Sequence, residues 1–182
     1  AYTALAEWGA CLLYILLMRH RLRGWKMALS ALIALIVQTA FLTLTSELPI
    51  IFWIPSMITA IIFMFIFIFF SCDISAKDAG FFCIRAFVLA EFAASFESQI
   101  YWFFWPEDTA PFLARTGMLI GIYLIVGVLV WILEKRHISP DLKLSVQQHE
   151  LWSAVLIGAV IFLISNMSFV SLKTPFSGQY PP

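Results

Sequence analysis

Long apolar stretches alternate with short polar ones along this chain, and the alternation predicts six hydrophobic helices. Several stretches reach the roughly 18–20 residues that cross about 30 Å of hydrocarbon. Helices satisfy their own backbone hydrogen bonds in lipid, and the apolar residues are too continuous for the alternating strands of a membrane barrel. We therefore expect an all-α, polytopic membrane helix bundle that forms a single transmembrane domain over residues 1–182. The expected spans are residues 1–18, 27–44, 49–70, 78–105, 112–133 and 151–170.

Composition excludes an ordinary soluble domain. Hydrophobic residues make up 62% of the chain and charged residues only 12%, whereas a soluble domain is nearer half apolar and a quarter charged. The net charge of zero gives no reason to expect a nucleic-acid partner. Cys11, Cys72 and Cys83 lack metal-ligand or CxxC spacing, so we read them as free thiols. No catalytic motif occurs, and we expect neither a metal nor a cofactor in this chain.

Basic residues collect in every second gap between the apolar stretches, which predicts the orientation. Cytoplasmic loops carry an excess of Lys and Arg, so these gaps are expected in the cytoplasm. Six spans then place both ends of the chain outside, and a cytoplasmic working domain would need a further crossing. The first stretch is expected to be a retained helix of a trimmed chain. Nine of eleven basic residues lie on the cytoplasmic side (Arg19, Arg21, Arg23, Lys26, Lys77, Arg85, Lys135, Arg136, Lys143), and Arg115 and Lys173 lie opposite.

The fourth stretch is the most polar, because it carries Arg85, Glu91 and Glu97. Ionisable residues inside a span are costly and are functional candidates. Steps of six residues rotate a helix by about 240°, so the three side chains are expected to point to three different faces. Arg85 lies near the cytoplasmic end, where its long side chain is expected to reach the headgroups.

Glu91 is expected near mid-membrane in a buried polar centre. It shares a helical stripe with Ser95 and Ser98, and its expected partners on other spans are Gln38 or Asn166. Two interpretations stay open. Either a neutral, protonated Glu91 holds helices together, or Glu91 takes part in ligand sensing or proton coupling.

The outer ends of the fourth and fifth stretches carry a second candidate site. Glu97 and Arg115 fall at similar depths. They would either form an ion pair between two helices or line an outward-facing pocket for a polar or peptide ligand. Asn166, Thr174 and Phe176, near the end of the chain, complete the expected ligand-binding set.

Small residues recur at four-residue spacing on three stretches, and such residues let helix backbones approach closely in lipid. We expect this packing to occur within the bundle rather than between two copies. The residues are Ala86, Ala90, Ala94 and Ser98 on the fourth stretch, Gly117 and Gly121 on the fifth, and Ala154 and Gly158 on the sixth.

The segment from Ser165 to Val170 (Ser-Asn-Met-Ser-Phe-Val), followed by Thr174-Pro175-Phe176-Ser177, resembles the end of the sixth membrane helix in a bacterial family. The family comprises sensor histidine kinases with a GHKL-type ATPase domain, related to peptide-pheromone receptors. The resemblance covers the membrane region only, and its sharpest part spans about a dozen residues. It implies a multi-pass protein of the bacterial cytoplasmic membrane. It also implies a further helix, a phosphoacceptor segment and an ATP-binding domain in a full-length homodimer.

The leading hypothesis is therefore the signal-sensing region of a two-component sensor histidine kinase. A peptide or small amphipathic ligand would bind on the outer side, and a shift between two helix packings would reach a kinase that this chain does not contain. One alternative is a transporter, or a subunit of one, with Glu91 as its coupling carboxylate. The other is a structural membrane partner whose polar residues only hold helices together.

Overall fold

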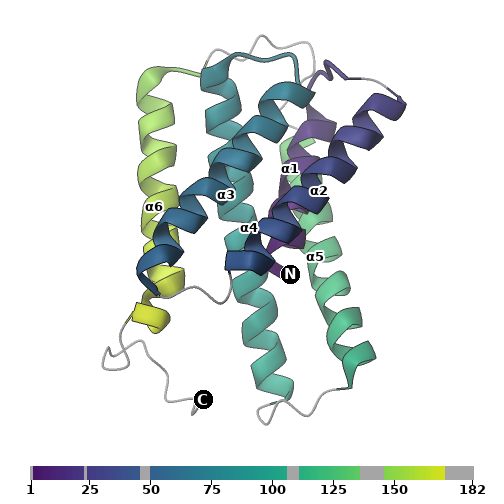
Figure 1. Cartoon of the computed structure of the whole chain (residues 1–182), viewed down its shortest axis with the longest axis vertical. Helices are drawn as coiled ribbons and strands as arrows, with labels where there is room; N and C mark the ends of the chain where they lie inside the picture. Colours follow the sequence, from purple (N-terminus) through teal and green to yellow (C-terminus); the bar gives the residue numbers. More distant parts are fainter. Residues whose placement is uncertain (1, 23, 46–49, 106–110, 136–145, 171–182) are drawn as a thin grey trace.

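A computed structural model describes residues 2–22, 24–45, 50–105, 111–135 and 146–170 of the chain (Figure 1). Each predicted apolar stretch is a helix, and among the described residues the only β-type pairing is the isolated bridge between His20 and Cys72. The predicted all-α class is thus confirmed. The helices are α1 (Tyr2–Leu17), α2 (Trp25–Thr45), α3 (Ile50–Ser71), α4 (Ala76–Phe104), α5 (Phe112–Lys135) and α6 (Gln148–Val170).

Four of these helices, α2, α3, α4 and α5, are long and apolar enough to cross a membrane within the described residues. The apolar parts of α1 and α6 are shorter, at Thr3–Leu17 and Gln148–Ile164. At 1.5 Å per residue, the 29 residues of α4 extend over about 43 Å. The structure therefore supports a membrane protein, while the sixfold crossing stays a prediction.

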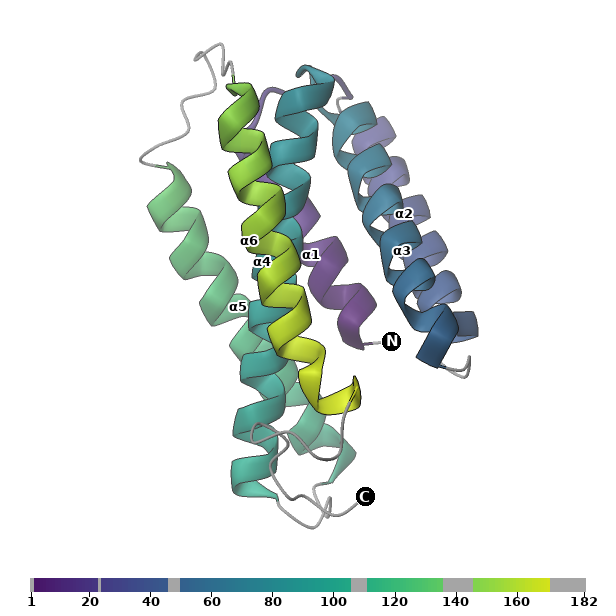
Figure 2. The same ribbon diagram turned by 90° about the vertical axis from the view of Figure 1, so that its left-hand side faces the viewer.

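Successive helices alternate in direction, so the turns after α1 and α3 and the start of α6 come to one end of the bundle (Figures 1 and 2). Main-chain hydrogen bonds join the first two turns, from Arg21 N to Ser71 O (2.9 Å) and from Asp73 N to Arg19 O (3.0 Å). The main-chain N–H of Val146, just before α6, donates to Asp78 Oδ1 at the start of α4 (3.1 Å). We call this the basic end, since Arg19 and Arg21 lie in the turn after α1, Lys26 and Lys77 lie in the first turns of α2 and α4, and Lys135 ends α5.

Local sequence explains where α2 and α4 begin. Gly24 has φ +61°, a conformation open to glycine because it has no Cβ, and it turns the chain into α2. Ser75 is the N-cap of α4: its hydroxyl accepts from the main-chain N–H of Asp78 (3.2 Å) and donates to Asp78 Oδ2 (2.6 Å). Both features fix helix starts at the basic end.

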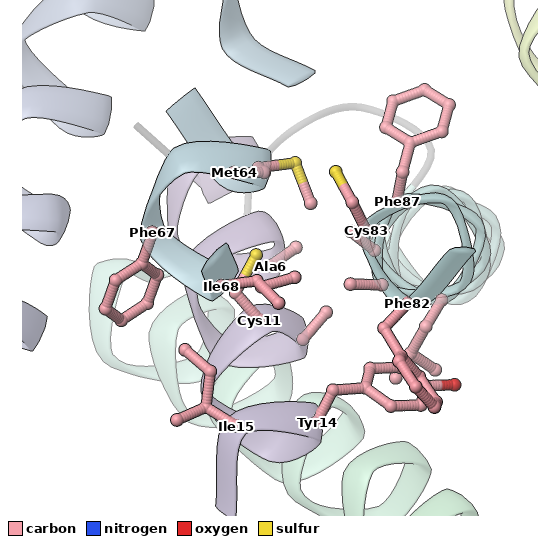
Figure 3. Close-up of a cluster of buried hydrophobic side chains, with 14 of the residues drawn as sticks. Ala6, Cys11, Tyr14, Ile15, Met64, Phe67, Ile68, Phe82, Cys83 and Phe87 are labelled. Atoms are coloured by element: carbon pink, nitrogen blue, oxygen red, sulfur yellow. The ribbon is translucent and has the colours of Figure 1, made fainter. Parts of the chain in front are cut away.

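The centre of the bundle is the pair α1 and α4. Helix α4 packs against α1, α3, α5 and α6, and α1 packs against α2, α3, α4 and α5. Between α1, α3 and α4 lies a close-packed apolar core that includes Ile15, Ile68 and Phe82 (Figure 3). The three cysteines are free and buried in it. Helices α2 and α6 are peripheral, because α2 packs only against α1 and α3, and α6 only against α4, within the described residues.

The small residues behave differently on α5 and α6. A Cβ added at Gly158 on α6 would come 2.9 Å from Ile84 Cγ2 of α4, so the predicted close approach within the bundle is confirmed there. Gly117 and Gly121 on α5 have no atom within 4 Å of an added Cβ. The prediction that they pack within the bundle is therefore wrong, because α5 turns this face away from its neighbours in the chain.

Candidate functional site: three polar layers across the bundle

A buried polar site lies where α1, α2 and α4 meet. Glu7 is 1% exposed, Gln38 4% and Glu91 8%. The Gln38 side-chain amide donates a hydrogen bond to Glu7 Oε2, and Glu91 interacts electrostatically with the Glu7 carboxyl. Glu7 Oε1 has no hydrogen-bond partner among the described residues. We call these three residues the middle layer.

Helical periodicity explains why Glu7 is inside. Ala4, Glu7, Cys11 and Tyr14 follow at steps of three and four residues, which place them on one helix face, and all four are at most 3% exposed. This face of α1 points into the bundle. A carboxyl group buried among apolar side chains needs a hydrogen-bond partner, and Gln38 provides one.

The sequence hypothesis for the buried centre named Gln38 and Glu91 but overlooked Glu7. The structure places Gln38 and Glu91 inside the bundle, leaves Ser95 half-buried and leaves Ser98 exposed. Glu7 could have been found from its spacing, because it is the one acidic residue of its stretch and shares a stripe with Cys11 and Tyr14. The hydrogen bond of Gln38 to Glu7 joins α2 to α1.

The second layer lies toward the basic end and joins α4 to α5. Arg85 Nη2 forms a hydrogen-bonded ion pair with Glu134 Oε1. The Arg85 guanidinium carbon also lies 5.8 Å from the centre of the Tyr14 ring and 5.6 Å from that of Phe81. Arg85 thus has a carboxylate partner near the basic end, and its side chain is 38% exposed. The expectation that it reaches the headgroups stays a prediction.

The third layer lies near the opposite end of α4 and α5. The Arg115 guanidinium carbon sits 4.6 Å from the centre of the Tyr101 ring, a distance typical of a cation–π interaction. Glu97 is half-buried, and Arg115 attracts its carboxyl electrostatically. Two of the expected ligand-binding residues thus lie in one layer, and the choice between helix contact and ligand pocket stays open.

The other expected ligand-binding residues lie beyond this layer. Asn166 belongs to the last turns of α6, but its side chain is outside the described part. Thr174 and Phe176 are outside the described residues altogether. Their predicted role in a pocket with Glu97 and Arg115 stays a prediction.

Helix α4 contributes to all three layers. Arg85, Glu91 and Glu97 are six residues apart, so each step along the helix is about 9 Å. Arg85 meets α5 and α1, Glu91 faces Glu7 of α1, and Glu97 faces Arg115 of α5. The three groups interact with different residues, as their helical spacing predicts.

Comparisons of this chain with protein-family models, with curated proteins and with solved structures give no match. The functional argument therefore depends on the layers themselves and on the charge pattern.

Proposed function

We propose that this chain is the signal-sensing membrane region of a bacterial two-component sensor histidine kinase. In this proposal the chain crosses the cytoplasmic membrane six times, with the basic end inside and both chain ends outside. Two observations support it: the turns rich in Lys and Arg gather at one end of the bundle, and residues 165–177 resemble the corresponding segment of the GHKL-type kinases.

The single observation that carries the proposal is that α4 has an ionisable side chain in every polar layer. A movement of α4 along its axis would change the pairing of Arg85 with Glu134 at the same time as that of Glu97 with Arg115. Packed interiors change between discrete arrangements rather than deforming continuously, so such a helix has the properties of a two-state signalling element.

In the proposed mechanism a peptide or small amphipathic ligand binds at the third layer, which this orientation places on the outer side of the membrane. It would engage the carboxyl of Glu97 or the guanidinium of Arg115 and so replace part of their mutual attraction. Helix α4 would then shift relative to α5, and the ion pair near the basic end would pass the shift to the cytoplasmic side. A ligand shifts such an equilibrium only by its difference in affinity for the two states.

The test uses the full-length protein in lipid nanodiscs, with ATP-dependent autophosphorylation as the measurement. We expect Glu91→Gln and Glu97→Gln each to change the basal phosphorylation level at least twofold. Gln99→Ala, an exposed position on the same helix, serves as the control and should leave it unchanged. A full-length protein without autophosphorylation would contradict the kinase proposal. Unchanged phosphorylation in both glutamate variants would contradict only the proposed sites.

A transporter is the second candidate, because two carboxyl groups, Glu7 and Glu91, lie close together in the middle layer. Buried carboxyl groups in this position are typical of proton relays. Liposomes that contain this chain and a pH-sensitive dye distinguish the two proposals. A proton flux that Glu91→Gln abolishes would favour the transporter, and proton-tight liposomes would favour the sensor.

A further inference from the structure

A groove of about 380 Å³ runs between α2 and α3, with α1 as its floor. On the α2 side its wall contains Lys26, Ser30, Ala34 and Gln38. These residues follow at four-residue intervals and therefore share one helix face. Ser30 and Ala34 are small, which leaves space beside the helix, and Gln38 is the only buried residue of α2 among those described.

The groove opens sideways, away from the bundle. On its rim Ile33 is 52% exposed, Ile66 43% and Phe70 59%. Most of the side chains that line the groove are apolar, so few groups can hold water there, and leaving it empty would forfeit dispersion contacts along both walls. In a bilayer the matching occupant is a hydrocarbon chain.

The positive charge at one end of the groove indicates which lipid headgroup would carry this chain. Lys26 is the only charged residue that lines the groove in the described part of the chain, and it lies in the first turn of α2, at the basic end. The start of a helix also favours an anion, because its main-chain N–H groups carry partial positive charge. Trp25, next to Lys26, is 71% exposed, as suits an aromatic residue at the membrane–water boundary.

Length agrees with this assignment. Gln38 lies twelve positions after Lys26, which is about 18 Å along a helix. The hydrocarbon core of a bilayer is about 30 Å thick, so the groove is close to the depth of one leaflet. A chain that starts at Lys26 would end near the middle layer of the bundle.

We propose that this groove binds one acyl chain of an anionic phospholipid from the leaflet on the side of the basic end. The phosphate lies against the Lys26 ammonium group, and the chain lies against Ser30 and Ala34 toward Gln38. The Gln38 amide donates a hydrogen bond to Glu7. A lipid bound beside Gln38 therefore stabilises the part of α2 that contributes to the middle layer. This site is separate from the proposed ligand site at Glu97 and does not depend on a sensing function.

The test is native mass spectrometry of the protein released from nanodiscs that contain equal amounts of phosphatidylglycerol and phosphatidylcholine with identical acyl chains. We expect the unaltered protein to retain one lipid, mostly phosphatidylglycerol. Lys26→Gln should reduce this preference about fivefold, the effect of one basic side chain near an anionic headgroup. Lys77→Gln is the control, because Lys77 is exposed in the first turn of α4 and does not line the groove.

A second pair of variants tests the groove itself. Ala34→Phe fills it and should abolish retention of either lipid, whereas Ala40→Phe, on the exposed side of the same helix, should leave retention intact. Equal retention of the two lipids by the unaltered protein, or unchanged preference in Lys26→Gln, would overturn the proposal. If Ala34→Phe does not fold, Lys26→Gln still tests the lipid preference, because a change to an exposed side chain should leave the fold intact.

Discussion

Glu7 is a buried carboxyl group with one side-chain hydrogen-bond partner among the described residues. One of its carboxyl oxygens accepts from Gln38, and the other has no partner among the described residues. A buried polar atom without a hydrogen bond costs about 1–3 kcal/mol. The bond between α1 and α2 is therefore a point at which a small chemical change should alter the stability of the bundle.

We expect Gln38→Leu to destabilise the bundle, because the second Glu7 oxygen then also loses its partner. In a double-mutant cycle with Glu7→Leu, the coupling energy should be about 1 kcal/mol, since hydrogen bonds between membrane helices average about 0.6 kcal/mol and reach about 1.7 kcal/mol. Unfolding by steric trapping in bicelles measures it. Gln99→Leu, at an exposed position of α4, is the control, and a coupling energy of zero would contradict the contact.

The ion pair of Arg85 and Glu134 gives a second prediction at this scale. Glu134→Gln should destabilise the protein by about 1–2 kcal/mol. This is less than the about 3–5 kcal/mol for breaking a fully buried pair, because the Arg85 side chain is 38% exposed. Adding Arg85→Gln should restore part of the loss by removing the unpaired charge. Thermal unfolding in detergent tests this, and a double variant less stable than Glu134→Gln would argue against the pair.

At the scale of elements, the hydrophobic pattern located the helices well. The largest difference between a predicted and an observed boundary is at the start of α6, predicted at residue 151 and observed at Gln148. Partners of polar residues could not be predicted in the same way. Gln38 is 31 residues from Glu7, and Arg85 is 49 residues from Glu134. Such pairings depend on how helices pack, which the apolar pattern of a single stretch does not specify.

Helix α6 packs only against α4 within the described residues, and Gly158 is where it approaches α4 most tightly among the described glycines. Gly158→Leu should displace α6 and destabilise the protein by about 1–3 kcal/mol, as is usual for overpacking. Gly121→Leu is the matched control, because it adds the same side chain to a helix where nothing lies within 4 Å. Both changes gain the same helix propensity, so their difference in thermal unfolding reports packing. Equal stability of the two variants would rule out the close contact as a determinant.

At the scale of the whole molecule, the proposed orientation can be tested with single cysteines. Lys77→Cys lies at the basic end, and Trp105→Cys lies just after the far end of α4. In intact cells a membrane-impermeant maleimide should label only Trp105→Cys, and in inverted vesicles it should label only Lys77→Cys. The native cysteines are buried and should contribute little background. Labelling of both positions from the same side would contradict the alternation of the helices across the membrane.

The length of α4 also makes the protein sensitive to the thickness of its bilayer. About 43 Å of helix cannot lie upright within about 30 Å of hydrocarbon, so α4 either tilts or extends beyond the hydrocarbon. The energetic cost of such hydrophobic mismatch is a fraction of a kcal/mol per ångström, and lipids with longer or shorter tails change the mismatch. Because α4 packs against α1, α3, α5 and α6, a change in its tilt moves Arg85, Glu91 and Glu97 together relative to the groups that they face. Membrane thickness should thus act on the polar layers through the same helix as the ligand that we propose to bind at the third layer.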